Sequence, residues 1–200
     1  MDCNGVRNES NHPARWTWEM AFWALVGLAA LLMRLAQLGM APLGADEASG
    51  AVAAWRAATG RGLPLTDYNP FLLAVNSLLF TVFGASDALA RLAPALFGSL
   101  LALTPVLLRR HLGRVGALAT GVYLAISPTA LVASRRLEGT AIAAVGAMVF
   151  VGSILRFLET RRLRWLTLAA MSLALAVCSD ASAYGLLVPL ALASLLVSLL

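Results

Sequence analysis

Long apolar runs separated by short charged loops limit what this chain can fold into. Of its 200 residues, 60% are hydrophobic and only 12% are charged. Runs long enough to cross a bilayer, with the charges gathered between them, predict an all-α polytopic integral membrane protein. A transmembrane β-barrel would instead alternate polar and apolar residues over about ten residues between turns, and the sequence shows no such pattern.

About six transmembrane helices are expected. They fall at residues 17–39, 88–109, 115–133 with a kink at Pro128, 138–158, 163–179 and 182–200. Residues 1–16 are expected to be a disordered cytoplasmic tail, and residues 17–200 a single transmembrane domain. Because the last apolar run has no polar tail after it, the chain is expected to be the N-terminal part of a longer protein.

The segment Pro70–Phe83 decides the topology. Fourteen residues at about 1.5 Å each reach only about 21 Å, short of a hydrocarbon core about 30 Å thick. If this segment stays at the surface, the arginine-rich loops at 109–114 and 161–164 lie on the side of the N-terminus. Positive residues in short loops favour the cytoplasm, which predicts a multi-pass plasma-membrane protein with both termini inside. The net charge of +5 then reflects topology, and no nucleic-acid partner is expected.

Asp46 and Glu47 are the only adjoining acids in the chain, and they lie in the first outer loop. The apolar spacing from Ala48 to Ala58 predicts a juxtamembrane amphipathic helix on the membrane surface, or alternatively a helix packed on its neighbours. Asp46 is the first candidate for chemistry, because desolvation at the membrane boundary would make it a better base. The alternative is that Asp46 is a helix N-cap. For Glu47, the favoured interpretation is a solvated first-turn acid.

Two motifs follow the Pro-led segment. The first runs from Phe83-Gly84-Ala85-Ser86-Asp87 through Arg91-Leu92 to Leu96-Phe97-Gly98, and the second is Ile126-Ser127-Pro128 followed by Ser134-Arg135. In order and spacing they resemble the polyprenyl-phosphate-sugar-dependent GT-C glycosyltransferases, such as the protein O-mannosyltransferases and the lipid A aminoarabinose transferases. The resemblance covers roughly residues 20–200. Where that family often has a second acid, this chain has Thr140, with Glu138 displaced by two residues.

The resemblance implies that Asp46 is the catalytic base and that a polyprenyl-phosphate-sugar lipid is the donor. Arg135 and Arg136 would stabilise the leaving phosphate, or alternatively snorkel to lipid headgroups. The expected substrate-binding residues are Glu47, Asp67, Tyr68, Asn69, Arg135, Arg136 and Glu138. The alternative for residues 67–69 is that they only form a turn. The sequence predicts no metal ligands and no cofactor, and a requirement for a divalent cation is left open. Arg91 is expected to play a structural role with a buried partner, an acid such as Asp87 at i−4, and Arg34 to snorkel from the end of the first span.

The predicted function is an inverting membrane glycosyltransferase, or its N-terminal part, which acts on the extracytoplasmic face. The acceptor, whether protein, lipid or glycan, does not follow from the sequence. The alternative is a non-catalytic membrane subunit or a transporter-like helical bundle. Transporters carry acids near the membrane midplane, whereas nearly all charges here are expected at the ends of spans.

Overall fold

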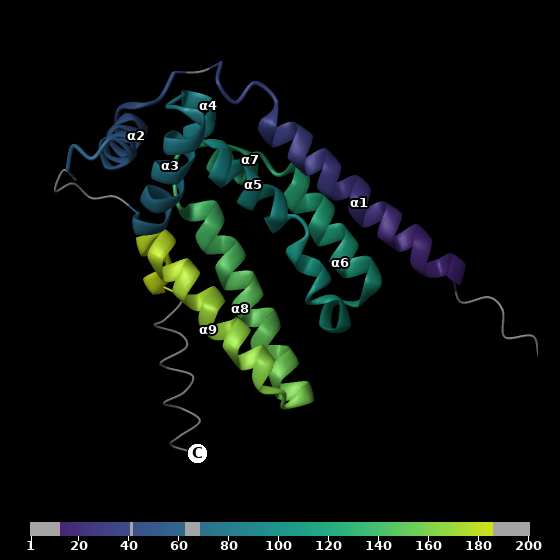
Figure 1. Ribbon diagram of the computed structural model, residues 1–200. Coiled ribbons are helices and arrows are strands. Elements are labelled where there is room, and N and C mark those ends of the chain that lie inside the picture. The colour runs from purple at the N-terminus through teal and green to yellow at the C-terminus, as the bar shows by residue number, and fades with distance from the viewer. Residues whose placement is uncertain (1–12, 41, 63–68, 186–200) are drawn as a thin grey trace, which may run out of the picture.

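The computed structural model describes residues 13–40, 42–62 and 69–185, and the regular structure in these residues is entirely helical (Figure 1). The elements are α1 (Pro13–Leu35), α2 (Ala45–Ala58), α3 (Pro70–Phe83), α4 (Asp87–Ala90), α5 (Leu92–Leu101), the 3₁₀ turn η1 (Thr104–Val106), α6 (Arg109–Ile126), α7 (Pro128–Arg135), α8 (Thr140–Thr160), α9 (Leu163–Ser179) and the 3₁₀ turn η2 (Ala181–Ala183). The predicted all-α membrane fold is confirmed.

Three stretches of the described chain are long and apolar enough to cross a membrane. They are Trp18–Leu35, Asp87–Val106 and Thr140–Thr160, and α6 with α7 adds a fourth if this pair, bent by 55°, is one span. The helix α9 is apolar but has 17 residues. The span predicted at 182–200 lies mostly outside the described residues.

The span predicted at 88–109 falls on the apolar stretch Asp87–Val106, but its helix is not continuous, because two prolines interrupt it. Pro94 has no N–H to donate to the carbonyl of Ala90, and Pro105 has none for the carbonyl of Leu101. Side chains take over both bonds: the Asn76 amide donates to Ala90 O at 3.2 Å, and the Thr104 hydroxyl donates to Leu101 O at 2.7 Å. The segment therefore divides into α4, α5 and η1.

The kink predicted at Pro128 is confirmed. Ser127 is non-helical, with φ −52° and ψ 122°, as expected for a residue before proline. The bend leaves the last carbonyls of α6 without helical partners, and Arg34 donates to two of them, Leu124 O at 3.0 Å and Ala125 O at 3.4 Å. Its Nε also donates to Ser134 Oγ at 3.0 Å. Arg34 is thus completely buried, and the prediction that it snorkels is wrong.

The two ends of the bundle are built from different parts of the helices (Figure 1). At the end where α1 and α6 begin, Arg109 pairs with Glu19 at 2.7 Å and Arg110 pairs with Glu159 at 3.2 Å. The opposite end holds α2, α4, the end of α7 and the start of α8. There α2 packs on α3 through Ala54 and Phe80, so the structure shows the alternative in which α2 is packed on its neighbours.

We expect Gly139→Ala to destabilise the packing of α9 against the loop before α8. A Cβ at Gly139 would overlap the backbone carbonyl of Ser179, at the end of α9, and approach Asn69 Nδ2 to 3.0 Å. Overpacking of this kind typically costs about 1–3 kcal/mol, measurable as a lower thermal midpoint in detergent. Gly116→Ala is the matched control, because its Cβ would meet only Leu112 Cβ at 3.5 Å. Equal midpoints for the two variants would contradict the close packing of α9 on the loop before α8.

Candidate functional site

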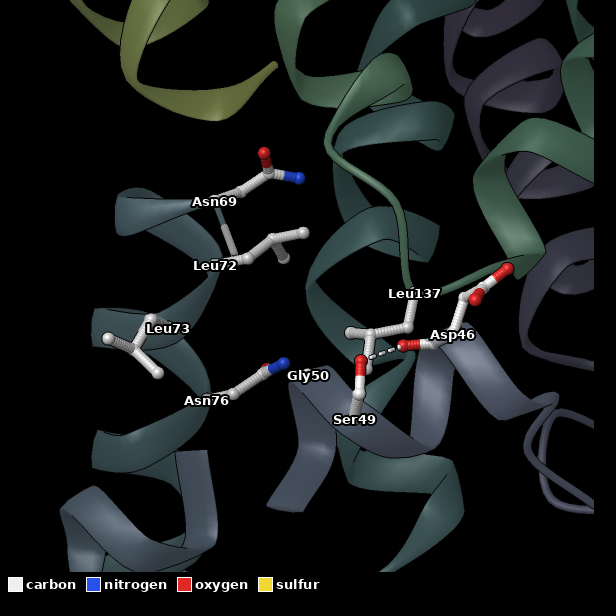
Figure 2. Close-up of a pocket in the computed structure, with 8 residues that line it drawn as sticks. All are labelled: Asp46, Ser49, Gly50, Asn69, Leu72, Leu73, Asn76 and Leu137. Carbon is white, nitrogen blue, oxygen red and sulfur yellow. Dashed lines mark hydrogen bonds between the residues drawn. The ribbon is translucent and has the colours of Figure 1, made fainter. Parts of the chain in front are cut away.

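Asp46 is the second residue of α2, because the helix begins at Ala45 with Gly44 as its N-cap. The interpretation of Asp46 as the N-cap is therefore wrong. Asp46 is exposed, and no hydrogen bond or ion pair joins its carboxylate to another of the described residues. Its backbone carbonyl accepts a hydrogen bond from Ser49 Oγ at 2.7 Å, while the carboxylate points to the other side of the helix start (Figure 2).

Glu47, in contrast, is fixed by three partners. Arg91 donates to both of its carboxylate oxygens, from Nη2 at 2.6 Å and from Nε at 3.3 Å. The backbone N–H of Leu137 donates at 2.7 Å, and that of Gly44 at 3.0 Å. The Arg91 and Glu47 side chains are only 8% and 12% exposed. The prediction of a solvated first-turn acid is therefore wrong. The expected buried acidic partner of Arg91 is present, and it is Glu47.

These contacts join three segments that are distant in the chain. Glu47 comes from α2, Arg91 from the break between α4 and α5, and Leu137 from the loop before α8. Arg91 also donates to Leu38 O at 3.4 Å and to Pro42 O at 3.2 Å, which ties in the segment after α1. Charge-assisted hydrogen bonds of this kind are roughly twice as strong as neutral ones, so the start of α2 is held firmly.

The two acids differ in what they can do chemically. Burial raises the pKa of Glu47, but the hydrogen bonds from Arg91, Gly44 and Leu137 and the charge of Arg91 outweigh it, and they lower the pKa to about 2. A carboxylate with so low a pKa is a poor proton acceptor near neutral pH. Of the pair, Glu47 is therefore the residue less suited to general-base work.

A cavity of about 90 Å³ lies beside Asp46, between α2 and α3 (Figure 2). Its lining residues are Asp46, Ser49 and Gly50 from α2, Asn69 just before α3, Leu72, Leu73 and Asn76 from α3, and Leu137. Asn69 was predicted as a binding residue from the sequence. Ser49 and Asn76 were missed, although Asn76 is the lone amide in the apolar segment Pro70–Phe83.

The other predicted residues that the structure describes are not among those that line this cavity. Arg135 is half-buried and donates to Ala36 O at 2.6 Å. Arg136 is exposed and pairs with Glu138 at 3.4 Å, directly beside Leu137 in the chain. Asp67 and Tyr68 lie outside the described residues. Within the part of the chain that the structure describes, no group of three or more His, Cys, Asp or Glu is placed to hold a metal ion.

Comparison with known proteins gives one match. The sequence model of the dolichyl-phosphate-mannose-protein mannosyltransferase family matches residues 67–199, more than half of the chain. No curated protein and no solved structure matches. The matched range begins after Asp46 and Glu47, but it includes Arg91 and Leu137, the residues that bind Glu47. The chain therefore belongs to the dolichyl-phosphate-mannose-protein mannosyltransferase family, a family of membrane glycosyltransferases.

Proposed function

We propose that the chain, by itself or as part of a longer enzyme, transfers a sugar from a polyprenyl-phosphate donor to an acceptor hydroxyl on the extracytoplasmic face. Asp46 is the general base. The observation that carries this proposal is the contrast within the Asp-Glu pair: Glu47 is fixed by Arg91 and Leu137, whereas the neighbouring carboxylate makes no such contact within the described chain. A fixed neighbour and an available carboxylate are what base catalysis requires.

The reaction is a single displacement at the anomeric carbon. The acceptor oxygen forms the new C–O bond as its proton passes to the Asp46 carboxylate. The bond between the anomeric carbon and the phosphate oxygen breaks on the opposite face, and its electron pair leaves with the lipid phosphate. Attack and departure on opposite faces invert the anomeric centre. Arg135 is the proposed partner of the leaving phosphate, whose developing charge a guanidinium stabilises.

The test is transfer from radiolabelled polyprenyl-phosphate mannose in membranes that contain the protein, with the anomeric configuration of the product determined by NMR. An inverted product supports the proposal, and a retained configuration contradicts the single displacement. If no polyprenyl-phosphate sugar supports transfer and the protein co-purifies with a larger membrane partner, the alternative of a non-catalytic subunit replaces it.

The proposed sidedness gives a labelling prediction. With Cys3 and Cys178 replaced by serine, Ala45→Cys and Thr129→Cys should react with an impermeant maleimide added outside intact cells, and Leu112→Cys only after permeabilisation. All three positions are exposed, so differences in labelling report sidedness. Ala74→Cys, on α3, should not label from the cytoplasm, and cytoplasmic labelling there would reverse the order of all later loops.

A further inference from the structure

Asn76, which lines the cavity beside Asp46, carries a buried hydrogen-bond acceptor that no described residue satisfies. Asn76 is 2% exposed, and its Oδ1 has no partner among the described residues. The orientation of the amide is fixed by chemistry, because the carbonyl of Ala90 can only accept, so Nδ2 must face it. An unpaired buried acceptor costs about 1–3 kcal/mol, and it is rare enough in folded proteins to need an explanation.

We propose that Asn76, with Asn69 and Ser49, forms a recognition subsite for a carbohydrate hydroxyl, which donates its hydrogen bond to Asn76 Oδ1. This inference rests on the proposed function and deepens it. The two amides and the hydroxyl line one cavity (Figure 2), and together they offer both donors and acceptors, as hydroxyl groups require. Leu72 and Leu73 line the same cavity and give it an apolar wall, suited to the C–H face of a sugar ring.

The same lining argues against a phosphate in this cavity. Ionised phosphate oxygens accept hydrogen bonds, and they would face another acceptor, the Oδ1 of Asn76. The cavity is also small. At about 90 Å³ it is smaller than the roughly 300–1,000 Å³ of typical ligand pockets. It therefore takes only the hydroxyl-bearing edge of a ligand.

The hydroxyl has two chemical sources, the transferred sugar or the acceptor, and kinetics with altered substrates distinguish them. Donors that each lack one sugar hydroxyl are compared with the parent donor, using wild type, Asn76→Ala and Ser49→Ala. If the hydroxyl belongs to the sugar, wild type should use one deoxy donor about 10- to 100-fold less efficiently, and Asn76→Ala should lose that discrimination. If the hydroxyl belongs to the acceptor, Asn76→Ala should keep the wild-type discrimination among the deoxy donors. Its KM for the acceptor should then be about 10- to 100-fold higher than that of wild type.

Two controls separate binding from folding. Ser77→Ala, on the next residue of α3, removes a hydroxyl that donates to Ala74 O within the helix, and it should leave all kinetic constants unchanged. Ser49 is exposed, so Ser49→Ala keeps the subsite testable even if Asn76→Ala fails to fold. The proposal is overturned if both Asn76→Ala and Ser49→Ala keep the wild-type discrimination among the deoxy donors and the wild-type KM for the acceptor.

A direct binding measurement keeps the outcome independent of transfer. Saturation-transfer NMR with methyl mannoside on the protein in nanodiscs should give a signal for wild type that Asn76→Ala and Ser49→Ala weaken. If wild type transfers no sugar but binds the mannoside through these residues, the proposed function fails and the subsite stands. If wild type transfers sugar and all variants give the same NMR signal and kinetics, the subsite fails alone.

Discussion

Asp46→Asn is expected to lower the rate of sugar transfer by about 10²- to 10⁴-fold, the usual effect of losing a general base. Asparagine keeps the size of the side chain but cannot take the acceptor proton. The fold should be unaffected, because Gly44 and not Asp46 caps α2, and because the Asp46 carboxylate has no partner among the described residues. The transfer rate and the thermal midpoint of unfolding, measured on the same preparation, test the effect on catalysis and the effect on the fold.

The matched control is Asp87→Asn, the same change at an exposed acid in the first turn of α4. It should leave transfer near the wild-type rate. If Asp46→Asn also transfers sugar at the wild-type rate, Asp46 is not the base. A loss of activity with a large fall in midpoint would mean that the aspartate supports the fold instead of the chemistry.

The largest expected effect on stability comes from Arg91→Met. This change removes the partner of Glu47 and leaves a carboxylate that is only 12% exposed without its cation. Breaking a buried ion pair by removing one partner typically costs about 3–5 kcal/mol. The loss should appear as a lower thermal midpoint and as faster proteolysis in the segment between α1 and α2, which Arg91 holds through Leu38 and Pro42.

The double variant Glu47→Gln, Arg91→Met separates the ion pair from packing. The glutamine amide is neutral, and its carbonyl oxygen can still accept from the N–H of Gly44 or Leu137, so removing both charges should cost less than Arg91→Met alone. The coupling between the two sites follows from the double-mutant cycle. If the losses of stability in Glu47→Gln and Arg91→Met add up to the loss in the double variant, the ion pair between Glu47 and Arg91 contributes little. Arg91 would then act through its contacts with backbone carbonyls.

Much of the helical layout follows from local sequence. The bounds of α3 and α9 agree with those predicted, because proline begins the first and charged or turn residues flank the second. The bend at Pro128 follows from the same rule. The sequence shows Pro94 and Pro105, but the prediction of one continuous helix gave more weight to the hydropathy of the segment. The side chains that replace the lost hydrogen bonds come partly from another helix.

The contacts that form the site were beyond local reasoning. Glu47 and Arg91 are 44 residues apart, and Glu47 and Leu137 are 90 apart. A carboxylate at the start of a helix looks the same in sequence whether water or arginine surrounds it. Local rules therefore placed Asp46 and Glu47 at the start of the correct helix, while their different environments depend on tertiary packing.

The burial of Arg34 has a consequence for biosynthesis. Its carbonyl partners on α6 and its hydroxyl partner on α7 follow 90 to 100 residues later in the chain. At about 5–20 residues per second, the ribosome needs roughly 5–20 s to synthesise them. During that interval α1 has already left the ribosome with an arginine near its far end. The first helix must therefore enter the membrane in a provisional position, with Arg34 hydrated at the interface, and reach its final position only when the bent pair α6–α7 arrives.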